Sequence, residues 1–194
     1  MDKVGILFML NYDIVITFFT IIYGLMLTDL FLSLHKLIKS RKIVKWHWLP
    51  LLAAWYLFLI ILKNWWDLSS FQNSVDSMNI YFFIAYGHLL LLIFLLVSTA
   101  LPDIIEKKGV DLKSYYFKNH RYFWGLMTSV VALSTLIAFF KTIDNLSEFN
   151  FVNFLALVIF VILLFVLTLS KRFWIHSVLL VLFVIMTILE IVNK

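Results

Sequence analysis

The chain has 194 residues, of which 63% are hydrophobic and 14% are charged, and its mean hydropathy is +1.00. A soluble domain has about 25% charged and about 45–50% apolar residues, so this chain lacks the polar side chains needed to cover a water-soluble globule. It contains no cysteine, which excludes disulfides and thiolate chemistry. The formal net charge of +5 is therefore first a matter of membrane topology, and no nucleic-acid partner is expected.

Six segments are apolar over about 20 residues, the length that crosses about 30 Å of hydrocarbon as a helix. In chain order they are residues 14–34, 48–66, 80–101, 122–140, 151–169 and 173–192. The short connection at 170–172 predicts that the last two spans form an antiparallel hairpin. We therefore expect a single all-α transmembrane domain over residues 1–194, with six helices arranged as three antiparallel hairpins in the lipid bilayer. Four spans plus a re-entrant hairpin are the alternative.

The basic residues predict the direction of the chain. Twelve of the sixteen Lys and Arg residues lie in the connections between spans one and two, three and four, and five and six. Lys and Arg concentrate in cytoplasmic connections of membrane proteins. Both termini are therefore predicted to be extracytoplasmic.

Aromatic residues at the predicted span boundaries agree with this arrangement, because Trp and Tyr collect at membrane–water interfaces. The expected interface anchors are Trp46, Trp48, Trp65, Trp66 and Trp124. In the long connection 102–121, Pro102 predicts the end of span three and Gly109 the end of a short interfacial helix. This connection and residues 35–47 are the expected docking surface for a cytoplasmic protein, although attraction to anionic lipid also explains their charge.

Asp29 is unusual because it lies within the first span, where a bare carboxylate costs about 2.5–3.5 kcal/mol. Thr20, Gly24 and Thr28 repeat every four residues beside it. Such a face of small residues allows another helix to approach closely. Asp29 is therefore expected to point into the helix bundle.

The expected partner of Asp29 is Arg121, whose long side chain starts at the inner end of span four. Gly125 and Ser129 form a second small face on that span. We predict that spans one and four pack together and pair Asp29 with Arg121. Alternative partners at a similar depth are His120, His47 and His35. Solvation of the acid near the interface, beside Lys36, is the simpler alternative.

His88 is the second unusual residue, because it lies near the middle of span three. A neutral imidazole bonded to Tyr23, Tyr86 or a backbone carbonyl is the common arrangement, and a pore-lining or proton-relay role is the alternative. The chain has no His-x-x-x-His pair, no acid cluster and no phosphate-binding glycine loop. We expect no metal, no cofactor and no enzymatic activity.

Three stretches resemble a group of small multi-span bacterial proteins. They are "GLMLTDL" at 24–30, "KWHWLPLLAAWYLFLIILKNWW" at 45–66 and "YYFKNHRYFWGL" at 115–126. The resemblance covers most of spans one to four. It implies an integral protein of the bacterial inner (plasma) membrane, and it transfers no catalytic residue to this chain.

Two functions are expected from these observations. The first is a homo-oligomeric channel in which Asp29, His88 and Arg121 line or gate a water-filled path. The second is a non-conducting membrane accessory or scaffold that recruits a cytoplasmic partner, for example in a bacterial defence or CRISPR-associated system. In the second case the intramembrane polar residues serve only to fix the packing of the helices.

Overall fold

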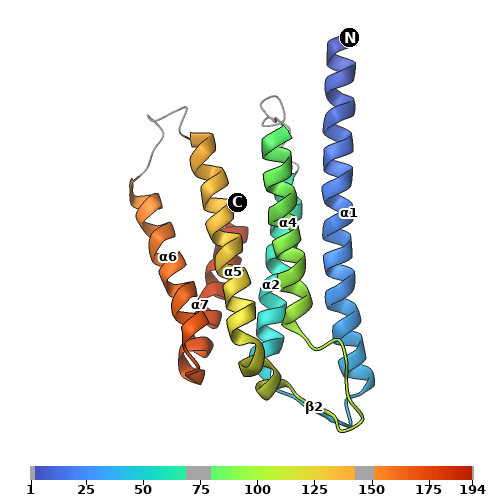
Figure 1. Ribbon diagram of the computed structural model, residues 1–194, viewed down its shortest axis with the longest axis vertical. Coiled ribbons are helices and arrows are strands. Elements are labelled where there is room, and N and C mark those ends of the chain that lie inside the picture. Colours follow the sequence, from blue (N-terminus) through green and yellow to red (C-terminus); the bar gives the residue numbers. More distant parts are fainter. Residues whose placement is uncertain (1–2, 69–79, 143–150, 194) are drawn as a thin grey trace.

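The computed structural model describes residues 3–68, 80–142 and 151–193 (Figure 1). Within these residues the chain is helical apart from its connections and two short strands. The helices are α1 (Lys3–Lys39), α2 (Trp48–Asp67), α4 (Ile80–Ala100), α5 (Leu112–Thr142), α6 (Phe151–Leu169) and α7 (Phe173–Val192). They run roughly side by side along the long axis of the molecule (Figure 1). The prediction of an all-α fold is confirmed.

Five helices in the described part of the chain, α1, α2, α4, α5 and α7, are long and apolar enough to cross a membrane. In α6 (Phe151–Leu169) the apolar stretch over residues with described side chains is Leu155–Leu169. A helix satisfies all of its backbone hydrogen bonds internally, which hydrocarbon requires. The chain is therefore a multi-pass membrane protein.

The helix ends agree with the predicted spans wherever the apolar stretch and the helix end together. α6 and α7 have the predicted bounds, and α2 and α4 differ from them by one residue at one end. In contrast, α1 continues to Lys39 and α5 begins at Leu112, ten residues before the predicted span. Polar residues such as Lys, Arg and Gln are good helix formers, so a helix need not stop where the apolar sequence stops.

The two long basic connections meet in a parallel pair of strands. β1 (Val44–Lys45) pairs with β2 (Val110–Asp111), with Val44 opposite Val110. The pair lies at the end of the bundle where α1 ends and α5 begins (Figure 1). This end of the molecule is therefore built from segments that are far apart in the sequence.

The prediction of an interfacial helix after Pro102 is wrong, because residues 101–109 form bends and a turn. The turn is closed by the Gly109 amide, which donates to the Glu106 carbonyl at 2.8 Å. Gly109 has φ +86°, a left-handed conformation that glycine adopts without strain. The next amide, that of Val110, donates to the Ile43 carbonyl at 3.2 Å. The chain thus turns back to meet β1, and this pairing replaces helical hydrogen bonds.

The predicted packing of spans one and four is also wrong. α1 packs against α2 and α4, whereas α5 packs against α4 and α6. α4 lies between α1 and α5 (Figure 1). A Cβ added at Gly125 of α5 would lie 4.0 Å from Thr168 of α6, so this small residue faces α6. Small residues permit close approach but do not select the neighbour.

Two of the three residues in the predicted small face of Thr20, Gly24 and Thr28 do not pack against another described helix. Gly24 and Thr28 are exposed, and nothing lies within 4 Å of a Cβ built on Gly24. The Thr28 hydroxyl donates to the Gly24 carbonyl at 2.8 Å, as the exposed Ser129 hydroxyl does to the Gly125 carbonyl at 3.0 Å. These hydroxyls are satisfied by their own helices and therefore need no partner helix.

Replacing Gly109 by alanine should weaken the pairing of β1 with β2. Alanine at φ +86° costs about 1–2 kcal/mol, and its Cβ would collide with the Ile43 carbonyl oxygen. We expect Gly109→Ala to lower the thermal unfolding midpoint in detergent, measured by circular dichroism. Gly87→Ala is the matched control, because nothing lies within 4 Å of its Cβ and alanine is favoured in helices. Equal midpoints for the two variants would contradict this account of the turn.

Candidate functional site

The structure does not gather the predicted intramembrane polar residues into one cluster. These residues are Asp29, His88, Arg121, His120 and His47. Arg121 is exposed on α5, and among the described residues it forms no ion pair with Asp29. α4 separates the two helices that carry them (Figure 1). The predicted Asp29–Arg121 pair is therefore wrong.

Asp29 lies near a second acid. It interacts electrostatically with Asp103 and Lys36. Asp103 follows Pro102 after α4, where it accepts a hydrogen bond from the Ser33 hydroxyl at 2.5 Å and lies 4.0 Å from Lys36 Nζ. Oδ2 of Asp29 is buried without a hydrogen-bond partner in the described part of the chain. The sequence indicated Lys36 as a neighbour but not Asp103, because only the fold brings the end of α4 beside α1.

His88 faces outward from α4. It is exposed, and its Nδ1 lies 2.8 Å from the carbonyl oxygen of Ile84. Because a carbonyl only accepts hydrogen bonds, Nδ1 carries the proton that it donates. Of the arrangements expected for this residue, the backbone carbonyl is the one present. His88 therefore lines no path inside a single chain.

His47 begins α2. Its side chain accepts a hydrogen bond from the Leu49 amide at 3.2 Å, in the N-cap position of the helix. Burial and, next, the positive charge of Lys113 lower the pKa of His47, which favours the neutral ring that this acceptor role requires. His47 is thus a helix cap and not a partner of Asp29.

His176, which the sequence did not single out, is the centre of a hydrogen-bonded chain between α5 and α7. It is fully buried. Trp124 Nε1–H donates to the Tyr116 hydroxyl at 2.9 Å, and this hydroxyl donates to His176 Nδ1 at 3.0 Å. His176 Nε2–H then donates to the Ser170 carbonyl at 2.8 Å. The carbonyl can only accept, so the partners assign the neutral tautomer protonated at Nε2.

Two residues predicted for other roles, Trp124 and His120, lie buried beside His176. Trp124 was expected as an interface anchor, but it is buried and its N–H is satisfied inside the bundle, so that prediction is wrong. His120 is 2% exposed, and its Nδ1–H donates to the Phe117 carbonyl at 2.7 Å. Tyr116, His120 and Trp124 recur every four residues and share one face of α5. That spacing is the sequence signal that could have grouped them.

The remaining predicted anchors lie at the two ends of α2 or just before it, with exposed rings. They are Trp46, Trp48, Trp65 and Trp66, which are between 44% and 72% exposed. Exposure is necessary for contact with lipid head groups, because the ring must reach the interface. The contact itself stays a prediction.

Removing the Tyr116 hydroxyl should destabilise the fold. In Tyr116→Phe the buried groups of Trp124 and His176 lose their hydrogen-bond partner, which costs about 1–3 kcal/mol per unsatisfied group. We expect a lower thermal unfolding midpoint in detergent than for the wild type. Tyr122→Phe on the same helix is the control, because Tyr122 is 55% exposed. An unchanged midpoint for Tyr116→Phe would mean that the hydrogen-bonded chain contributes no stability.

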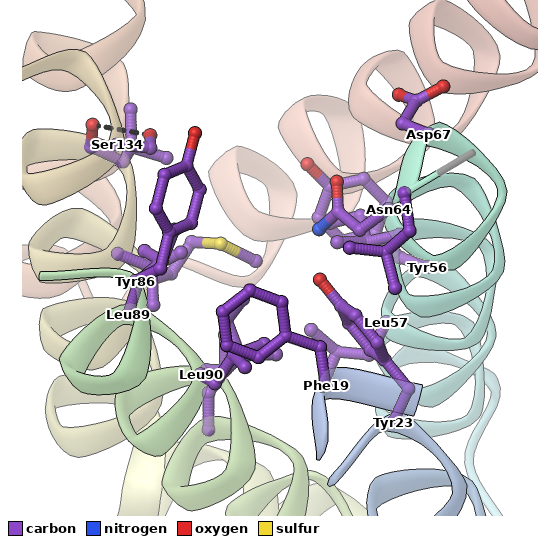
Figure 2. A pocket seen from close by; sticks show the side chains of 17 residues that line it. Phe19, Tyr23, Tyr56, Leu57, Asn64, Asp67, Tyr86, Leu89, Leu90 and Ser134 are labelled. Atoms are coloured by element: carbon purple, nitrogen blue, oxygen red, sulfur yellow. Dashed lines mark hydrogen bonds between the residues drawn. The ribbon is translucent and has the colours of Figure 1, made fainter. Parts of the chain in front are cut away.

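A cavity of about 320 Å³ lies between α1, α2, α4 and α5. Its lining is mainly apolar, with polar atoms from Tyr23, Tyr56, Asn64, Asp67, Tyr86 and Ser134. Figure 2 shows Asp67, Asn64 and Ser134 toward one end of the cavity and Phe19 and Leu90 toward the other. The sequence missed this site because no helix contributes more than a few of its polar groups.

An adjoining cavity of about 450 Å³ lies on the α7 side of α2. Tyr56, Ile60 and Asn64 line both cavities. In the adjoining one, Lys63 Nζ lies 2.8 Å from Glu190 Oε1, which joins α2 to α7. The charge of Lys63 is therefore balanced on the side of α2 that faces α7.

The chain matches no protein-family model, no curated protein and no solved structure. The resemblance to small multi-span bacterial proteins therefore stays a prediction.

Proposed function

We propose that the protein is a non-conducting accessory of the bacterial inner membrane whose basic end recruits an acidic cytoplasmic protein. The observation that supports this proposal is the collection of basic side chains at one end of the bundle. Segments 35–47, 102–121 and 170–172 contain twelve Lys and Arg residues and three acids, a formal charge of +9. All twelve basic residues are exposed. The rest of the chain has a formal charge of −4.

The fixed geometry of this basic end favours a protein partner. The pairing of β1 with β2 holds the two long connections together, and Lys113 Nζ lies 5.1 Å from the centre of the Phe173 ring. A preorganised charged surface loses less entropy when it binds a partner and discriminates better between partners. Topology alone explains the sign of the charge, but it does not require an ordered surface.

The position of the paired strands also separates a protein partner from lipid. Figure 1 shows β2 at the extreme end of the molecule, beyond the ends of α4, α6 and α7. Ile104, in the same connection, is 81% exposed. An exposed apolar side chain in a connection of net positive charge suits a protein interface with an apolar centre and a charged rim. We infer that this surface faces the cytoplasm and not the head groups.

A homo-oligomeric channel is the second candidate. It is favoured by His88, Gly24 and Thr28, which are exposed on the outside of the bundle, where a second copy could cover them. Within one chain, however, the polar residues expected to line a path lie apart. The accessory function therefore has more support from the geometry.

The proposal requires six crossings, with the basic end in the cytoplasm and both termini outside. Because the chain has no cysteine, single Lys42→Cys and Asn193→Cys variants report these two ends. A membrane-impermeant maleimide should label Asn193→Cys on intact cells and Lys42→Cys only after permeabilisation. The opposite pattern would reverse the orientation. Labelling of both variants from one side would rule out six crossings.

Charge reversal beside the paired strands should abolish recruitment. Lys42, Lys107 and Lys108 are exposed next to β1 and β2, and replacing all three by Glu turns attraction to an acidic partner into repulsion. After crosslinking in cells, the wild type should retain a discrete cytoplasmic protein of acidic surface. The triple Glu variant should retain less than about a tenth of it, since 1.4 kcal/mol changes affinity tenfold.

The triple Arg variant of the same positions keeps the charge and is the matched control, so it should retain the partner fully. Equal retention by the Glu and Arg variants would contradict the proposal. Planar-bilayer recordings separate the second candidate. Discrete currents from the purified wild type that change in Asp29→Asn or His88→Ala would support a channel instead.

A further inference from the structure

The cavity between α1, α2, α4 and α5 is large for the interior of a helix bundle. Protein interiors are packed as densely as organic crystals, whereas this space measures about 320 Å³. Ligand-binding cavities begin at about 300 Å³. The lining includes Asp67 and Leu68 at the end of α2, so the cavity reaches the end of the bundle opposite β1 and β2 (Figure 1).

The lining changes in character along the cavity. Figure 2 shows Phe19 and Leu90 at one end and Asn64 and Ser134 near the other, with the Tyr23 hydroxyl directed toward the polar end. Leu57, Ile93 and Leu96 extend the apolar part. A matching ligand has an apolar body and one polar head group, because apolar walls give affinity and a few placed polar groups give orientation.

The charge of the lining indicates the sign of that head group. Among the described residues that line the cavity, Asp67 carries the only formal charge, and none is Lys, Arg or His. Lys63, one turn earlier on α2, lines the adjoining cavity and pairs with Glu190 at 2.8 Å. The aromatic rings of Phe19, Tyr23 and Tyr86 add faces that attract cations. All of these features disfavour an anion and favour a cation.

We propose that this cavity binds a lipophilic organic cation, with its apolar body against Phe19, Leu57 and Leu90 and its positive head group near Tyr23, Tyr86 and Asp67. Asp67 has an interaction of its own in the structure. A quaternary ammonium ion accepts and donates no hydrogen bonds, so it is attracted by the field of the carboxylate and by the aromatic faces. The site therefore needs no unoccupied carboxylate oxygen.

Two probes of nearly equal shape test the proposal. Phenyltrimethylammonium is a cation, and tert-butylbenzene is its neutral isostere. Binding of each to the full chain in a neutral maltoside detergent would be measured by isothermal titration calorimetry. We expect the cation to bind at least about tenfold more tightly than the isostere, as one charge pair at an effective dielectric constant of about 20 would produce. Absence of binding, or equal affinity for the two probes, would overturn the proposal.

Variants then locate the binding site. Asp67→Asn should weaken binding of the cation about tenfold and leave the isostere unaffected, and Val131→Phe should fill the cavity and abolish binding of both. The double variant Lys63→Gln with Glu190→Gln is the matched control, because it removes the ion pair of the adjoining cavity without leaving Lys63 unbalanced. It should bind like the wild type.

Thermal unfolding midpoints show whether each variant is folded. The comparison of the two probes uses the wild type alone, so it remains valid if a variant does not fold. If a folded Asp67→Asn binds the cation as the wild type does, or a folded Val131→Phe retains binding, the assignment to this cavity is wrong. If the double variant Lys63→Gln with Glu190→Gln weakens binding as much as Asp67→Asn, the cation lies in the adjoining cavity and the proposal fails.

Discussion

Hydrocarbon tolerates neither an unpaired backbone amide nor a bare charge, and most of this fold follows from that constraint. The apolar segments are helices, and the basic residues are collected where the helices end. Individual polar side chains within the membrane-spanning segments have their own local interactions. His88 donates to the carbonyl of Ile84, and His176 has a partner at both ring nitrogens. Asp29, in the last third of α1, interacts electrostatically with Asp103, which follows α4, and with Lys36 of its own helix.

The collection of basic residues creates a second requirement, because a formal charge of +9 in three short segments repels itself. The parallel strands, the left-handed Gly109 and the contact of Lys113 with Phe173 hold these segments in place despite the repulsion. A chain that needed only the correct topology could leave such connections unordered. The order of this end is therefore the structural feature on which the proposed interaction with a partner rests.

Hydropathy predicted the membrane-spanning segments. The predicted helix bounds agreed with the structure to within one residue where the helix ends with the apolar sequence, as in α2, α6 and α7. It could not predict the ends of α1 and α5, because helices continue into polar sequence. Hydropathy also could not predict which helices pack against each other. A helix that is apolar on all sides does not reveal which side is buried, so Trp124 was expected at the interface and Gly24 inside, and the structure reverses both.

The cavity between α1, α2, α4 and α5 was equally hidden in the sequence. Tyrosines spread over three helices form a site only after those helices pack, and no spacing rule connects them. The net charge of the part of the chain that contains the cavity, however, follows from the placement of the basic residues in the connections at the other end. When twelve of sixteen basic residues lie at one end, the remaining chain has a formal charge of −4. Asp67, the acid in the cavity lining, belongs to this net acidic part of the chain, so the cation affinity and the acidic partner that we propose would have one common physical origin.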